Sequence, residues 1–206
     1  MSFWGQFNLM NPSSPIQEEM LLFHDHAMVL LLGIFSFVAI LGMTLLLNKF
    51  SSRSILEAQT LETVWTIIPA LLLIWLALPS LRLLYLLDEQ SNSSVTLKST
   101  GHQWYWSYEI NNGDSYDSYM LKDTNLLEVD NRAFTFFGLN TLVITTSADV
   151  LHAFTIPSVG MKMDSVPGRL NSMSMYLNMP GIYYGQCSEI CGANHSFMPI
   201  VVESKF

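Results

Sequence analysis

Two long, uninterrupted apolar stretches stand out in the first part of the chain. Residues 27–47 and 63–81 carry no charged side chain. As a helix the first stretch is roughly 31 Å long, which is about the hydrocarbon thickness of a bilayer. The second contains Pro69 and Pro79, which membrane helices tolerate better than exposed soluble helices do. The pattern predicts a hairpin of two transmembrane helices.

The polar residues that flank these stretches predict where the helices begin and how they are oriented. Ser14 and Ser54 each start a capping-box pattern, so both helices should begin before their spans. Lys49 and Arg53 lie in the connector, whereas the 26 residues before the first span contain no Lys or Arg. The positive-inside rule therefore places the connector on the cytoplasm-like side and both chain ends outside. The first span is too long and lacks a basic n-region, so no cleaved signal peptide is expected.

After residue 88 the pattern changes to short alternating runs broken by Gly, Pro, Asn and Asp, which is typical of an all-β domain. The expected fold is a transmembrane α-helical hairpin in residues 1–87, followed by a Greek-key sandwich in residues 88–206. Strands are predicted at 95–100, 102–110, 142–146, 153–156, 172–177, 182–186 and 200–203.

Composition supports a membrane protein with a soluble part. Only 13% of the residues are charged and 50% are hydrophobic, whereas about 25% are charged in a typical soluble domain. The net charge of −8 would repel a phosphate backbone, which excludes nucleic acid as a partner. The sequence has no glycine-rich phosphate loop and no nucleophile elbow.

One segment carries four potential metal ligands in twelve residues. Cys187, Cys191, His195 and Met198 have the spacing C-x3-C-x3-H-x2-M, and thiolate together with thioether favours copper over hard cations. His152 precedes the strand-like run 153–156, so a sandwich can bring it beside this loop.

Three simpler interpretations compete with a copper pair. A disulfide between the cysteines leaves His195 and Met198 without a reason for their spacing. A zinc site of two cysteines and two histidines has no use for Met198. A single blue-copper centre leaves one cysteine surplus. Two thiolates that bridge two copper ions, each capped by one histidine, account for all five residues and give a site that carries single electrons.

The sequence also resembles a known family along almost its whole length. The runs that carry the resemblance are SPIQEEMLLFHDH (14–26), GHQWYWSYE (101–109), LLEVDNR (126–132), DVLHAFTIPSVGMKMDSVPGR (149–169) and YYGQCSEICGANHSFMPI (183–200). They are similar to the cytochrome c oxidase subunit II family, of the mitochondrial type. The resemblance implies a cupredoxin-like sandwich with a binuclear copper A centre. The subunit would accept electrons from reduced cytochrome c and pass them to haem in the catalytic subunit, where oxygen reduction drives proton pumping.

The same resemblance implies residue roles. The copper ligands would be His152, Cys187, the carbonyl of Glu189, Cys191, His195 and Met198. The side chain of Glu189 would reach a magnesium ion shared with the catalytic subunit, and Trp104 would be the point at which the electron enters. Asp114, Asp117, Asp130 and Asp149 are candidates for pairing with lysines of cytochrome c. Glu62 matches a position at the mouth of a proton path.

The implied location is the inner mitochondrial membrane, with two spans and with both termini and the copper domain in the intermembrane space. Implied partners are cytochrome c, the catalytic haem-copper subunit I, other oxidase subunits and membrane lipid.

Two alternative functions differ from this one in protein class or in cofactor. A membrane-anchored copper chaperone has its histidine far downstream and usually one span, and a quinol oxidase counterpart lacks the copper ligands that are present here.

Overall fold

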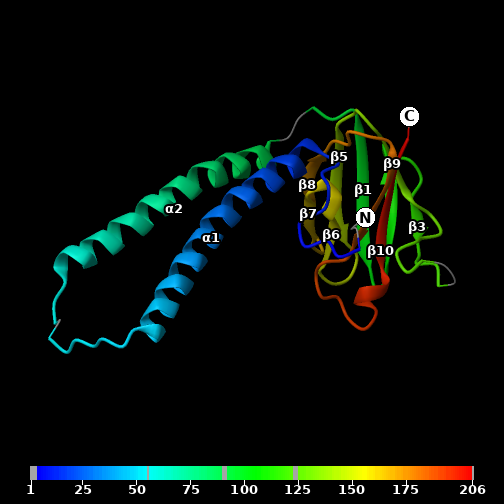
Figure 1. The fold of residues 1–206 in the computed structure, drawn as a ribbon. Helices are drawn as coiled ribbons and strands as arrows, with labels where there is room; N and C mark the ends of the chain where they lie inside the picture. Colours follow the sequence, from blue (N-terminus) through cyan, green and yellow to red (C-terminus); the bar gives the residue numbers. More distant parts are fainter. Residues whose placement is uncertain (1–3, 55, 90–91, 123–124, 206) are drawn as a thin grey trace. The chain divides into compact units, whose positions relative to one another are not determined.

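The computed structural model describes residues 4–54, 56–89, 92–122 and 125–205, and within them two helices precede ten strands (Figure 1). The helices are α1 (Pro15–Leu47) and α2 (Gln59–Asp88). The strands are β1 (Val95–His102), β2 (Tyr105–Ile110), β3 (Tyr116–Ser118), β4 (Ala133–Phe136), β5 (Thr141–Ser147), β6 (His152–Ile156), β7 (Met161–Ser165), β8 (Asn171–Met175), β9 (Gly181–Gln186) and β10 (Pro199–Lys205). Two short 3₁₀ turns, η1 (Pro157–Val159) and η2 (His195–Phe197), follow β6 and precede β10.

The two helices start differently from each other. Helix α1 begins at Pro15, and the Ser14 hydroxyl accepts the amide of Gln17 at 3.0 Å, as the capping pattern predicts. The predicted cap at Ser54 is wrong, because α2 begins only at Gln59. The capping pattern alone does not fix a helix start. The buried Ser14 hydroxyl is also held by a bond to the carbonyl of Val159, whereas the exposed Ser54 hydroxyl contacts that of Ser52 at 3.2 Å.

Both helices are long and apolar enough to cross a membrane, and almost none of their surface is buried. In the hairpin, His26 of α1 contacts Trp75 of α2 with ring centroids 3.9 Å apart. The exposed apolar surface needs lipid or other protein helices around it, because contiguous apolar patches of this size are rare on soluble monomers. The predicted fold class, a pair of apolar helices followed by a β-sandwich, is confirmed.

The strands form one five-stranded sheet, one three-stranded sheet and one two-stranded sheet. Their orders are β3-β2-β1-β5-β8, β4-β10-β9 and β6-β7. Strand β1 pairs in parallel with β5 and antiparallel with β2, a non-local arrangement typical of Greek-key folds. The sequence prediction missed β3, β4 and β7. Strands β3 and β4 are three and four residues long, and β7 (MKMDS) places Lys162 and Asp164 on its exposed face.

The predicted strand 102–110 is interrupted. Strand β1 ends at His102 and β2 begins at Tyr105, and these two residues pair across the hairpin, so Gln103 and Trp104 form its turn. The prediction failed here because neither residue belongs to the Gly, Pro, Asn and Asp set that usually marks a turn.

Strand β6 lies at the centre of the sandwich, with four of its five residues buried. The core around it includes Leu97, Trp106, Tyr108, Val143, Phe154, Ile156, Ile200 and Val202. Strand β9 passes so close to β6 that a Cβ atom on Gly185 would lie 1.9 Å from the carbonyl oxygen of Thr155. The approach continues past the end of β9, where the amide of Ser188 donates to the carbonyl of Ala153 at 3.2 Å.

The chain divides into two compact units, residues 20–87 and a unit that joins the residues up to Glu19 with those from Asp88 onward. Within the latter, the amide of Ser13 donates to the carbonyl of Ser158, and the Ser14 hydroxyl donates to the carbonyl of Val159. The N-terminal segment is therefore bonded to the sandwich. The functional division at 87/88 stays a prediction.

Candidate metal centre

The end of the β9–β10 ladder positions four of the predicted ligands. The last pair of this ladder joins Gln186 to Pro199, so Cys187 and Met198 both lie one residue beyond it. The loop between them carries Cys191 and, in η2, His195. The loop also carries Glu189, and the remaining predicted ligand, His152, is the first residue of β6.

The ligand atoms of these residues converge. Those of His152, Cys187 and Cys191 all lie within 4.8 Å of one another. The Cys187 sulfur is 3.8 Å from His152 Nδ1 and 3.4 Å from the Glu189 carbonyl oxygen. The Cys191 sulfur is 3.4 Å from His195 Nδ1 and 3.5 Å from the Met198 sulfur. The structure thus brings together every residue that the sequence analysis assigned to copper.

The donor set is soft and largely buried. His152, Cys187, Cys191 and Met198 are between 0 and 6% exposed, and His195 is half-buried. Both cysteines are free thiols. Two thiols, two imidazoles and one thioether fit copper, whereas structural zinc does not need the thioether.

The two thiols differ in acidity. Burial opposes ionisation of Cys187, but its contacts with His152 and with the backbone at Ala153 and Glu189 outweigh this and lower its pKa. Burial and then the negative charge of Cys187 raise the pKa of Cys191. One thiolate therefore forms readily, and the second needs nearby positive charge, which bound metal supplies.

Asp149 holds the buried histidine. Its Oδ1 lies 2.9 Å from His152 Nε2, which leaves Nδ1 directed at Cys187. Burial lowers the pKa of His152, but contacts with Cys187 and Asp149 outweigh burial and raise it. The carboxylate of Asp149 also accepts the amides of Gln103 and Val150 at 2.7 and 2.6 Å. The sequence analysis assigned Asp149 only to donor docking and missed this supporting role.

Two close contacts place the ligands against β1 and β2. A Cβ atom on Gly101 would lie 2.8 Å from His152 Cδ2, so glycine leaves room for the imidazole ring. The indole N–H of the fully buried Trp106 donates to the carbonyl of Met198 at 3.3 Å. Sequence spacing gave no sign of either contact, because each joins segments far apart in the chain.

Trp104 lies directly against the ligand loop. Its indole Cζ2 and Nε1 atoms would be 3.1 and 3.3 Å from a Cβ atom at Gly192, the residue after Cys191. Among the described residues the indole N–H has no hydrogen-bond partner. A hollow of about 570 Å³ opens beside the indole. It is lined by Trp104, Tyr119, Met120, Lys122, Leu126, Asn194 and Phe197.

The other candidate acids differ in their hydrogen-bond contacts. Asp114 and Asp117 are exposed, and Asp117 accepts the Tyr119 hydroxyl at 3.3 Å. Asp130 accepts the amides of Tyr119 and Asn131, each at 2.7 Å, so it also organises its loop. Glu62 is exposed in the first turn of α2.

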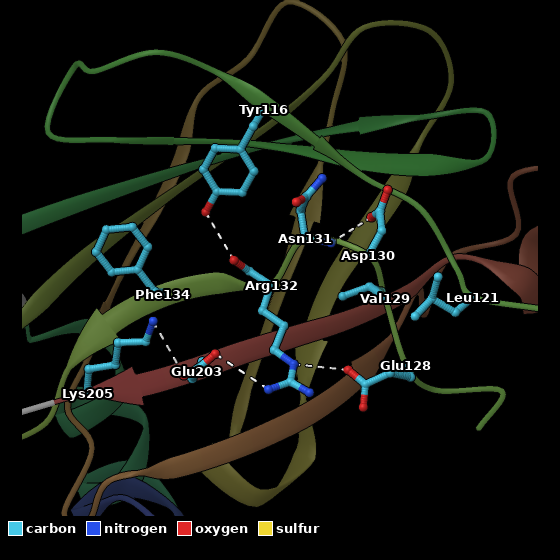
Figure 2. Close-up of a pocket in the computed structure, with 10 residues that line it drawn as sticks. All are labelled: Tyr116, Leu121, Glu128, Val129, Asp130, Asn131, Arg132, Phe134, Glu203 and Lys205. Atoms are coloured by element: carbon cyan, nitrogen blue, oxygen red, sulfur yellow. Dashed lines mark hydrogen bonds and ion pairs between the residues drawn. The ribbon is translucent and has the colours of Figure 1, made fainter. Parts of the chain in front are cut away.

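A second hollow, of about 430 Å³, is lined by Asp130 and by charged residues that form ion pairs with one another (Figure 2). Arg132 points between the carboxylates of Glu128 and Glu203, at 3.0 and 3.5 Å. Lys205 pairs with Glu203 and lies 5.8 Å above the ring centroid of Phe134. The hydrogen bond to Glu128 raises the pKa of Arg132. The network joins the 128–132 loop to β10, the strand that follows Met198.

Comparison with known proteins places this arrangement in one family. Residues 95–205 match the model of the cytochrome c oxidase subunit II periplasmic domain, and residues 2–83 match that of its transmembrane domain. Cytochrome c oxidase subunit 2 of Albinaria caerulea is 64% identical over 99% of this chain and 95% of that protein. The same subunit of Choristoneura rosaceana is 52% identical over 99% of this chain and 94% of that protein.

Solved structures agree for the sandwich. The crystal structure of the periplasmic domain of cytochrome oxidase subunit II from Bradyrhizobium japonicum is 42% identical, with a TM-score of 0.55. The alignment covers 56% of this chain and 86% of the Bradyrhizobium japonicum chain. The crystal structure of a mixed disulfide intermediate between a thioredoxin-like protein and subunit II of cytochrome c oxidase is also similar, with 41% sequence identity and a TM-score of 0.52. The alignment covers 57% of this chain and 86% of that chain.

Proposed function

Because this chain belongs to the cytochrome c oxidase subunit II family, we propose that it holds two copper ions and passes single electrons from cytochrome c to the haem subunit. The chain is the electron-transfer subunit of an oxidoreductase and assembles with other oxidase subunits. The observation that carries the proposal is the convergence of both free thiols with His152, next to His195 and Met198.

The proposed ligands are His152, Cys187, the carbonyl of Glu189, Cys191, His195 and Met198. When bound, the copper pair supplies a one-electron carrier in which each metal changes its charge only partly. The chain contributes rigidity. Asp149 orients the His152 ring, and Trp106 anchors the carbonyl of Met198. Ligands held in this way cannot relax far between redox states, which favours fast electron transfer.

Magnesium is proposed at the side chain of Glu189. Its carbonyl oxygen faces the Cys187 sulfur at 3.4 Å, while the residue as a whole is exposed. An exposed carboxylate is a suitable oxygen ligand for magnesium, which usually takes only one or two protein carboxylates. The remaining ligands would come from the catalytic subunit and water. In this arrangement one residue would give its carbonyl to the soft copper site and its carboxylate to a hard cation.

Cytochrome c is proposed to dock over Trp104. The hollow beside the indole is rimmed by Tyr119, Leu126 and Phe197, which are 45%, 64% and 49% exposed. Residues 88–206 contain 12 acidic and six basic residues, a balance that attracts a basic partner at low salt. Trp104 spans from this surface to Gly192, so we propose it as the point at which the electron enters.

Neutralising two exposed acids tests this docking surface. The double substitution Asp114→Asn and Asp117→Asn should raise the KM for cytochrome c about fivefold at low salt and leave kcat unchanged, because exposed charges contribute about 0.2–1 kcal/mol each. Steady-state oxidation over a salt series measures both constants. Asp164→Asn, an exposed acid on β7, is the control. An unchanged KM and salt dependence in the double variant would contradict the assignment.

The proposed location is the inner mitochondrial membrane, with lipid around α1 and α2 and with the sandwich in the intermembrane space. The two apolar helices and the basic residues Lys49 and Arg53 between them support this orientation. Glu62, exposed in the first turn of α2, is proposed at the mouth of a proton path into the catalytic subunit.

Metal analysis of the purified oxidase tests the proposal. We expect two coppers per chain from this site, in addition to any copper in the catalytic subunit, and a paramagnetic resonance spectrum with hyperfine splitting from two equivalent nuclei. Splitting from one nucleus, or zinc in place of copper, would contradict it.

The rival function, a copper chaperone, predicts copper transfer to other proteins without turnover of cytochrome c. A quinol oxidase counterpart predicts no copper in this chain.

A further inference from the structure

The turn between β1 and β2 touches both parts of the chain that supply metal ligands. The backbone amide of Gln103 donates to Asp149 Oδ2 at 2.7 Å, and Asp149 Oδ1 contacts His152. The side-chain amide of Gln103 donates to the carbonyl of Cys191 at 2.8 Å. One residue therefore joins the segment that leads into β6 to the loop between β9 and β10.

The ligand loop has a glycine where Gln103 and Trp104 approach. Gly192 adopts φ +124°, a conformation that strongly favours glycine. A Cβ atom there would lie 3.3 Å from Gln103 Nε2 and 3.1 Å from Trp104 Cζ2. Gln103 and Trp104 thus contact the loop at the same point, directly after Cys191.

We propose that Gln103 is a positioning residue of the metal centre, which sets the spacing between His152 and Cys191 and holds Trp104 against the ligand loop. The inference rests on the proposed function. Gln103 is an exposed residue, and an exposed glutamine beside a docking surface would ordinarily be interpreted as a partner contact. Its two hydrogen bonds assign it instead to the support of the ligands, a role that outer hydrogen-bond partners commonly have in metal sites.

In the side-chain hydrogen bond Gln103 is the donor, which makes the inference specific. The acceptor is the carbonyl of Cys191, so only a side chain with an N–H or O–H at this distance can replace Gln103. Methionine has a similar length without a donor. Glutamate has the same shape but, when ionised, presents an oxygen to the carbonyl and repels it. The backbone bond to Asp149 is available to either variant.

The test uses Gln103→Met and Gln103→Glu in the intact oxidase. We expect copper affinity at this site, measured by competition with a chelator, to fall about tenfold in both variants, at the lower end of the effect of such outer contacts. The paramagnetic spectrum should show two inequivalent copper nuclei. In Gln103→Met, which adds no charge at the docking surface, kcat with cytochrome c should fall while KM changes less than twofold. Lys98→Met, which removes an exposed cation paired with Glu109 on the same hairpin, is the matched control and should behave as wild type.

A purely docking role predicts the opposite result, with KM raised, kcat unchanged, and wild-type copper affinity and spectrum. That result overturns the inference. The wild-type oxidase, measured in parallel, tests the proposed function separately, since it should contain two coppers at this site whatever Gln103 does. If one variant fails to assemble, copper affinity and the spectrum of the other still decide, because the two substitutions remove the same donor by different chemistry.

Discussion

Replacing His195 by alanine is expected to reduce oxidation of cytochrome c to background. The imidazole Nδ1 lies 3.4 Å from the Cys191 sulfur, and alanine offers no donor in its place. The half-buried position lets water enter where the ring was, so one metal would lose its capping ligand without a protein replacement. Turnover should fall at least about a hundredfold, because losing even an outer hydrogen-bond partner of a metal ligand costs about 10–100-fold. Stopped-flow oxidation of reduced cytochrome c measures it.

Ser196→Ala is the control for this variant, because it removes the next side chain of the same loop from an exposed position. It should keep both the copper content and the rate. Full turnover in His195→Ala, with two coppers still bound, would show that His195 is not a ligand. Copper content should be measured on the same sample, because it separates a lost metal from a protein that never assembled.

Gly185→Ala should prevent the sandwich from forming its metal site. The added methyl group would lie 1.9 Å from the carbonyl oxygen of Thr155, a backbone atom that cannot turn aside as a side chain can. Strand β9 would have to move away from β6, and Cys187, two residues further on, would move away from His152. A change of this kind costs more than about 4 kcal/mol, which is exceptional for a single substitution. We expect loss of both copper and oxidase assembly.

The same strand offers the matched control. Gly181 begins β9 and has no atom within 4 Å of its would-be Cβ, so Gly181→Ala should assemble normally. Copper content and the amount of assembled oxidase in the membrane measure both variants. Wild-type levels of both for Gly185→Ala would mean that β9 and β6 are further apart than the structure has them.

The sequence predicted those parts of the fold that local pattern controls. Apolar length identified both helices, and the Ser14 pattern gave the start of α1. The same reasoning failed at Ser54, whose exposed hydroxyl contacts Ser52, whereas the Ser14 hydroxyl is also bonded to the carbonyl of Val159. It also ran the predicted strand 102–110 through the turn between β1 and β2, since Gln103 and Trp104 are not turn-forming residues in isolation.

The same distinction between local pattern and contacts made only in the fold applies to the metal site. Four ligands follow one another in a single loop, so their spacing was visible, and His152 was recognised from its place before a strand. The residues that support them were not visible. Gln103 and Gly101 act through contacts between segments far apart in the chain, and only the fold brings these residues to the ligands. Asp149 is only three residues from His152 but looked like an ordinary surface acid, because the sequence does not show that its carboxylate meets the imidazole.

The strand order also determines when, during biosynthesis, the cysteine loop can take its final form. Strand β10 lies between β4 and β9, so the three-stranded sheet is complete only when residues 199–205 have been translated and, in the proposed orientation, moved across the membrane. The cysteine loop is held at both ends by the pairing of β9 with β10, so before then it lacks one of its two anchors. Under the proposed function and location, copper binding would therefore follow translocation of residues 199–205, and until then both thiols would stay without metal.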